Sequence, residues 1–118
     1  MKIRELKELL SAELMTEDIS LLDGDVYNAC CSDMMSDVLA FVKDQGVLLT
    51  GLVNEQVIRT ASMMDMVCIV FVRDKTPTAD MVRLAEECDI VVLKSAYRAY
   101  EACGKLYTSG LVAREHQS

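Results

Sequence analysis

The sequence lacks the long apolar stretches that mark membrane-spanning or secreted chains. No window approaches the roughly 18 consecutive apolar residues that cross a bilayer. The opening MKIRELKELL is amphipathic, whereas a signal peptide is continuously apolar. We therefore expect a cytoplasmic protein with no membrane partner. Proline occurs once in 118 residues and 52% of the residues are hydrophobic, a composition typical of a single globular domain and unlike that of a disordered chain.

Signatures of common enzyme classes are also missing. The chain has no GxGxxG or GxxxxGK[ST] phosphate loop, no HExxH zinc motif and no GxSxG nucleophile motif. Its single histidine, His116, lies in a polar C-terminal segment, where no rigid element would position a general base. We therefore predict no catalytic residues and a protein that is not an enzyme.

The five cysteines include no CxxC pair, although zinc and iron-sulfur sites usually place two thiols about one turn apart. The sequence thus predicts no metal site and no cofactor. Cys68, Cys88 and Cys103 fall at expected core positions, which favours a role as small buried hydrophobes. Cys30 and Cys31 instead end an expected strand beside a helix N-terminus that would favour the thiolate, so a redox or metal role for this pair is the alternative.

Basic residues are scarce relative to acidic ones. Twelve Lys and Arg stand against nineteen Asp and Glu, which gives a net charge of -7. Residues 1–59 carry 5 basic and 11 acidic residues, and the remainder carries 7 and 8, so neither half is basic. A chain without a segregated basic patch repels phosphodiester backbones, and we expect no nucleic-acid partner.

Regular alternation of strand and helix patterns begins at Val26. Short apolar runs alternate with amphipathic segments four times, at residues 26–30 and 32–42, 47–51 and 54–64, 66–72 and 77–88, and 90–93 and 97–107. Two of the runs, VCIVFV and IVVL, are apolar at every position, as in strands that are covered on both faces. The pattern predicts an α/β fold: a small, doubly wound, mainly parallel sheet of about four strands with helices on both faces.

The remaining segments complete one domain over residues 1–118. Residues 1–25 are expected to form a lead-in, with a helix on the stripe Ile3, Leu6 and Leu10 and then an irregular connection or short hairpin. Four β-α units follow over residues 26–110, and residues 111–118 form a polar tail. Expected helix caps are Ser32, Asn54, Thr76 and Ser95.

Polar residues gather where the four expected strands end. Ligands of parallel sheets bind beyond the carboxyl ends of the strands, near helix N-termini. Hydroxyl groups, a glycine and cations in that position suit a small anionic ligand such as a phosphorylated metabolite or nucleotide. A role as helix caps and solvated loop ends is the alternative. The predicted ligand-binding residues are Ser32, Asp33, Thr50, Gly51, Arg73, Lys94 and Ser95.

The order of these motifs resembles the DRTGG domain family in its small, stand-alone form. The likeness rests on CCSDMMSDVLAFV, VLLTGLVNEQVIRTASMMDM, CIVFV, PTADMVRLAEECDIVVLKS and YRAYEACGKLY, and covers about residues 26–110. Its most specific pieces are the SDxxSDV run from Ser32 and the pair Thr50-Gly51. Where relatives usually have a glycine pair after the third strand, this chain has Phe71-Val72-Arg73-Asp74.

The resemblance implies a non-catalytic regulatory or ligand-binding role, since such domains accompany CBS domains and phosphotransacetylase-type enzymes. It also implies an alternative. Small relatives are found beside iron-only hydrogenases, so this chain could be an accessory protein of such a system, with a redox enzyme as partner and with iron-sulfur binding as one version.

A homodimer is the last expectation. A small open sheet leaves edges that favour pairing, and Tyr97, Tyr100 and Tyr107 are expected on the last helix away from its core face.

Overall fold

The computed structural model describes residues 1–41 and 46–111. Within these ranges the chain forms five α-helices, one 3-10 helix and five strands. The helices are α1 (Ile3–Leu9), α2 (Met35–Phe41), α3 (Glu55–Met63), α4 (Ala79–Glu87) and α5 (Ala99–Thr108), with the 3-10 helix η1 (Ile19–Asp23). The strands are β1 (Glu13–Leu14), β2 (Asn28–Cys31), β3 (Gly46–Thr50), β4 (Cys68–Phe71) and β5 (Val91–Lys94).

One sheet carries the fold, with strand order β1-β5-β4-β3-β2. Strands β2 to β5 are parallel neighbours in chain order, and β1 adds a short antiparallel edge to β5. The predicted α/β class is therefore confirmed, with five strands rather than about four because two residues of the lead-in join the sheet. The short hairpin considered for this lead-in is not formed, since β1 pairs with the distant β5.

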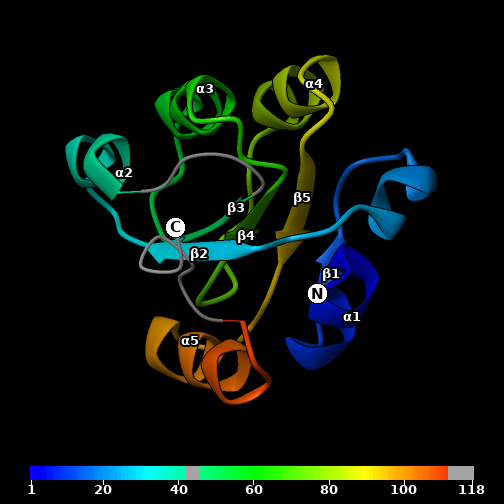
Figure 1. Ribbon diagram of the computed structural model, residues 1–118. Helices are drawn as coiled ribbons and strands as arrows, with labels where there is room; N and C mark the ends of the chain where they lie inside the picture. The colour runs from blue at the N-terminus through cyan, green and yellow to red at the C-terminus, as the bar shows by residue number, and fades with distance from the viewer. Residues whose placement is uncertain (42–45, 112–118) are drawn as a thin grey trace.

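Helices cover both faces of the sheet, as predicted. The three crossover helices α2, α3 and α4 lie together on one face, because successive crossovers of one hand step across the sheet in one direction (Figure 1). The opposite face is covered by α1 and α5, from the two ends of the chain (Figure 1). Among the helices that the structure describes, none is long and apolar enough to span a bilayer.

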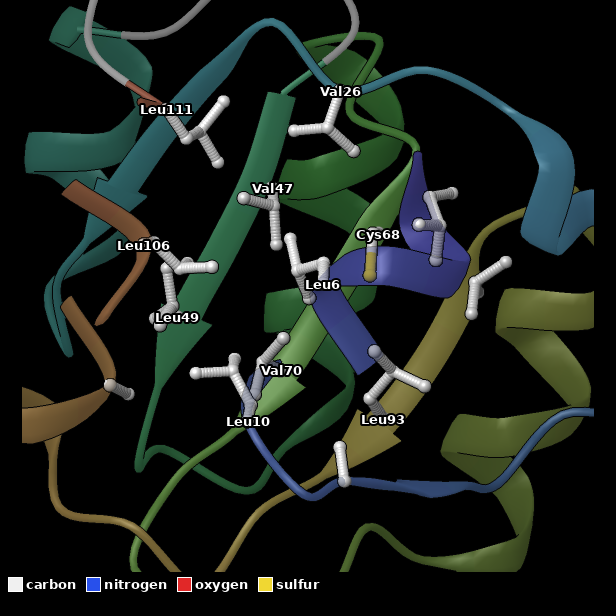
Figure 2. Packing of buried hydrophobic residues seen from close by; sticks show 14 of the residues in the cluster. Leu6, Leu10, Val26, Val47, Leu49, Cys68, Val70, Leu93, Leu106 and Leu111 are labelled. Carbon is white, nitrogen blue, oxygen red and sulfur yellow. The ribbon is translucent and has the colours of Figure 1, made fainter. Parts of the chain in front are cut away.

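Side chains from the parallel strands enter two hydrophobic cores, one on each side of the sheet. Alternate residues of β4 show this, because Val70 packs toward α1 and α5 whereas Ile69 and Phe71 pack toward the crossover helices. Figure 2 shows the first of these cores, with Leu6 of α1 above Cys68 and Val70. All residues of β4 and residues 91–93 of β5 are buried, which confirms the expectation that the runs VCIVFV and IVVL form strands covered on both faces, with Val67 at the start of the first run half-buried. All residues of β3 are buried as well.

The helix faces and starts differ in part from the sequence prediction. Asn54 caps α3 as expected, but Thr78 rather than Thr76 caps α4, because its hydroxyl accepts the Met81 N–H at 3.1 Å. Ser95 does not cap α5, whose N-cap is Arg98. Leu39, expected on the buried face of the helix after the first parallel strand, is exposed. Val42, expected on the same face, lies outside the described residues, as do His116 and the tail 112–118.

The edge of β5 depends on a side chain from the lead-in. After β1 ends, the Met15 N–H donates to the Val92 carbonyl at 2.8 Å. The Val92 N–H then donates to the Thr16 hydroxyl at 3.3 Å, and Thr16 is buried. A threonine side chain thus completes the pairing of a strand whose antiparallel neighbour has only two residues.

We predict that Thr16→Val lowers the free energy of unfolding by about 1–3 kcal/mol, because the shape is kept while the buried Val92 N–H loses its acceptor. Urea denaturation measures the change. Thr16→Ser keeps the hydroxyl and loses one methyl group, so it should cost less, about 0.8 kcal/mol. If Thr16→Val were as stable as the starting protein, the hydroxyl would not hold this edge.

Candidate functional site

The carboxyl ends of the parallel strands lie in one row. The strand register places Thr50 of β3 beside Phe71 of β4, and Phe71 beside Lys94 of β5. The segments that follow these residues leave the sheet at a common edge. Four of the seven predicted ligand residues meet there, and we call them the strand-end cluster: Asp33, Thr50, Gly51 and Arg73.

Asp33 joins the end of β2 to the end of β3. One carboxylate oxygen, Oδ1, accepts the Thr50 hydroxyl at 2.9 Å and the Gly51 N–H at 2.8 Å. The other oxygen, Oδ2, lies 3.7 Å from Nη2 of Arg73. The Gly51 N–H is the largest cause of a lowered pKa for Asp33. Burial opposes it as the second-largest effect, and the Thr50 hydroxyl and the Arg73 charge lower the pKa further.

The guanidinium of Arg73 lies directly over Gly51. A Cβ atom built on Gly51 would fall 2.0 Å from Nη2 of Arg73, so only a residue without a side chain admits the arginine in this position. About half of the Arg73 side chain remains exposed (48%), and its distance of 3.7 Å from the Asp33 carboxylate is at the long end for an ion pair. Donor groups of the guanidinium therefore face solvent.

Arg73 and the next residue, Asp74, both have left-handed backbones, with φ of 58° and 59°. The turn is fixed from the neighbouring connection: the Arg73 N–H donates to the Tyr97 carbonyl at 2.8 Å, and the Asp74 N–H donates to the Ser95 carbonyl at 2.9 Å. Left-handed backbone costs a residue with a side chain about 1 kcal/mol more than glycine. The turn thus has the conformation that a glycine pair would favour, yet carries Arg and Asp.

The other three predicted residues are placed differently. Lys94 pairs at 3.6 Å with Asp74, the residue that directly follows Arg73. Ser95 is buried, with its hydroxyl donating to the Leu10 carbonyl at 2.8 Å and accepting the Tyr97 N–H at 3.2 Å. Ser32 accepts the Met34 N–H at 3.0 Å and so stabilises the turn before α2. The structure does not bring Ser32 or Ser95 to the cluster.

The cysteines depart from expectation in two respects. Cys68 is buried as predicted, but Cys88 and Cys103 are half-buried rather than core residues, and Cys31 is exposed at the end of β2. Neither Cys30 nor Cys31 gains thiolate character, because burial raises the pKa of Cys30 and the hydrogen bond to Cys103 raises that of Cys31. Among residues 1–41 and 46–111, no three His, Cys, Asp or Glu side chains could hold a metal ion.

The tyrosines near the last helix separate into two groups. Tyr100 and Tyr107 are exposed on α5, at 90% and 68%, as predicted. Tyr97 precedes the helix and packs on the core, with the Lys105 ammonium 4.9 Å from its ring centre, so its expected place beside the other two is wrong. An open groove of about 640 Å³ runs along α5, lined by Tyr100, Glu101, Cys103, Gly104, Lys105, Tyr107 and Thr108.

Comparison with known proteins gives a likeness of fold. No family model matches the chain, and no curated protein matches it by sequence. Its structure is similar to a crystal structure of the CBS and DRTGG domains of the regulatory region of a pyrophosphatase from Clostridium perfringens, complexed with the activator diadenosine tetraphosphate. The TM-score is 0.76 at 14% sequence identity, and the match covers 92% of this chain but only 46% of that one. The chain therefore shares a fold with about half of that regulatory region.

The lowered pKa of Asp33 predicts a pH dependence of stability. Because folding lowers this pKa, the ionised carboxylate stabilises the folded state above the pKa of the unfolded chain, and this contribution is lost as the pH falls through the folded value. Asp33→Asn keeps an acceptor oxygen and removes the charge. Urea denaturation should therefore show the variant to be less stable at pH 7, with a smaller difference from the starting protein at about pH 3. A difference that is the same at both pH values would contradict the prediction.

Proposed function

We propose that this chain is a non-catalytic regulatory domain that binds a small anionic ligand, of the nucleotide or acyl phosphate class, at the strand-end cluster. The observation that carries the proposal is the half-exposed guanidinium of Arg73, fixed over Gly51 at the carboxyl edge of the parallel strands. A planar guanidinium offers paired donors that match a phosphate group. Ligands of open α/β sheets bind at this edge.

The backbone strain supports a role for the Arg73 side chain. Glycine would occupy this left-handed position at lower cost, and strained residues cluster at ligand sites. The strain holds the guanidinium over Gly51, whose missing side chain leaves the space. Arginine at this position therefore supplies a cation at the sheet edge, which a glycine could not supply.

Asp33 gives the site a means of signalling. A phosphate group on Arg73 would take the place of the Asp33 carboxylate, which lies 3.7 Å away and has the same charge sign. The carboxylate also holds Thr50 and Gly51 and stands at the entry to α2. Binding an anion would therefore weaken the link between β2 and β3 and shift α2. This exchange is how the domain would report an occupied site.

The structural likeness agrees with this role. The similar structure belongs to a regulatory region and contains a nucleotide activator with several phosphate groups. A regulatory domain without catalytic groups is also what the missing enzyme motifs predict. The resemblance and the geometry at Arg73 therefore favour the same class of ligand.

A thermal shift experiment with ATP, AMP and acetyl phosphate tests the proposal. A ligand at 100 times its Kd adds about 2.7 kcal/mol of stability, which raises the Tm of a chain of this size by on the order of 10 °C. Arg73→Gln should weaken binding about tenfold or more, since charged hydrogen bonds contribute about 1.5–3 kcal/mol. Asp33→Asn should strengthen binding, because it removes the competing negative charge.

Two further variants make the test specific. Gly51→Ala should fold normally and lose binding, because its methyl group needs the space of the movable guanidinium. Arg83→Gln removes an arginine of α4 that pairs with Asp80, away from the strand ends, and should bind as the starting protein does. Binding that survives both Arg73→Gln and Gly51→Ala, or no shift with any of the three compounds, would overturn the proposed site.

We further propose that two copies of the chain pair through α5. Tyr100 and Tyr107 border Gly104. Among the residues that the structure describes, apart from the chain neighbours and the backbone of α5, no atom lies within 4 Å of a Cβ built on Gly104, so a second helix can approach closely there. Exposed aromatic side chains such as these two tyrosines are enriched in protein–protein interfaces. An antiparallel copy of α5 would place each Tyr100 near the Tyr107 of the other copy.

Light scattering at micromolar concentration should therefore give the mass of a dimer, about twice 13.1 kDa. Tyr100→Glu should give a monomer, because a buried unpaired charge disfavours the interface. Met63→Glu, at an exposed hydrophobic residue of α3 on the other face of the sheet, makes the same charge change away from α5 and should leave the dimer intact. A monomeric starting protein would refute this interface.

A further inference from the structure

Basic residues gather on the two turns that follow β4 and β5. Residues 73–75 and 94–98 carry four basic side chains and one acidic side chain, although the whole chain has a net charge of -7. Two backbone hydrogen bonds join these turns, from the Arg73 N–H to the Tyr97 carbonyl at 2.8 Å and from the Asp74 N–H to the Ser95 carbonyl at 2.9 Å. Their positive charge therefore extends from the strand-end cluster toward β5.

The strand register places Lys94 in line with Thr50 of the strand-end cluster. Thr50, Phe71 and Lys94 are partners across three neighbouring strands. The residue before each of them packs into the core beside α1 and α5: Leu49, Val70 and Leu93. Because successive side chains of a strand alternate, Thr50, Phe71 and Lys94 all point to the side of the crossover helices. Neighbouring strands lie about 4.8 Å apart, so the backbones at Thr50 and Lys94 are separated by roughly 10 Å.

The turn after β4 contributes to two ion pairs, one toward each end of this row. On the β3 side, Nη2 of Arg73 lies 3.7 Å from Oδ2 of Asp33. On the β5 side, Oδ1 of Asp74 lies 3.6 Å from Nζ of Lys94. Both distances are longer than a hydrogen bond, so these contacts leave the donors of both cations available. The two carboxylates are 58% and 69% exposed, and each can turn away without opening the core.

The placement of Lys94 favours a bound anion. Its side chain is only 21% exposed, so the packing around it restricts the ammonium, whereas the Asp74 carboxylate that faces it is mostly in solvent. An ammonium that is partly removed from water gains more from an anion than a fully solvated one does. Its three N–H groups suit a phosphate group, which offers several acceptor oxygens.

We propose, building on the anion site proposed above, that the preferred ligand contains a diphosphate group and that Lys94 binds the second of the two linked phosphates. The first phosphate takes the place of the Asp33 carboxylate beside Arg73, and the second takes the place of the Asp74 carboxylate beside Lys94. The two cations lie on either side of the end of β4, so a single phosphate reaches only one of them. A nucleoside monophosphate or an acyl phosphate therefore fills half of the site.

Isothermal titration calorimetry of the full chain with AMP, ADP and inorganic diphosphate, in a buffer that contains EDTA, tests the proposal. ADP and diphosphate should each bind about tenfold more tightly than AMP, because the second phosphate adds a charged hydrogen bond. Lys94→Gln should weaken the binding of ADP about tenfold and leave that of AMP unchanged. Asp74→Asn should strengthen the binding of ADP and leave that of AMP unchanged, because it removes the carboxylate that competes for Lys94.

Two further lysine variants make the test specific. Lys94→Arg keeps the positive charge and should keep the preference for ADP. Lys2→Gln is the matched control, because it removes a lysine that pairs with Asp25 ahead of β2, and it should bind AMP and ADP as the starting chain does. A urea denaturation curve shows that each variant is folded.

The outcomes separate this inference from the proposed site. Equal affinities for AMP and ADP, or a Lys94→Gln variant that weakens AMP as much as ADP, would overturn the diphosphate inference. AMP binding that is lost in Arg73→Gln would then still support the anion site. The absence of binding by any of the three compounds would overturn the anion site and this inference with it.

Discussion

Complete burial of the central strands is the constraint on which the rest of the molecule depends. Every residue of β3 and β4 is buried between two helical layers, so these strands have no exposed surface that could carry a polar function. Polar groups can lie only where the strands end and the backbone leaves the sheet. Asp33, Thr50 and Arg73 lie there, where a hydrogen bond joins Thr50 to Asp33 and an ion pair joins Asp33 to Arg73.

The chain-order arrangement of the parallel strands decides how the two faces differ. Three crossovers of one hand place α2, α3 and α4 on one side, and only the ends of the chain remain to cover the other (Figure 1). That second face is closed by α1 and α5, so residues of the last helix reach the first parallel strand. The hydrogen bond from the Ser95 hydroxyl to the Leu10 carbonyl joins the end of β5 to the segment after α1 on this face.

Sequence patterns predicted the structure correctly where neighbouring residues alone decide it. The runs VCIVFV and IVVL predicted buried strands because covered strands need no polar alternation, and Asn54 predicted a helix start because its side chain accepts a nearby amide. Ser95 is a position where the sequence pattern predicted a helix cap and the structure shows another role. It has the right residue type for a cap, but its hydroxyl is used by the carbonyl of Leu10, which lies 85 positions earlier in the chain.

The sequence by itself determined the α/β class, the buried strands and four residues that share the sheet edge, because alternation and strand ends are local properties of the chain. The tertiary structure alone decided that β1 joins β5, that Thr16 completes that edge and that Arg73 lies over Gly51. Each of these contacts joins segments that are distant in the chain, and the hydrophobic periodicity of each segment does not indicate which distant segment it meets. Their positions depend on strand order and on the left-handed turn at Arg73-Asp74, which is fixed by hydrogen bonds from the connection after β5.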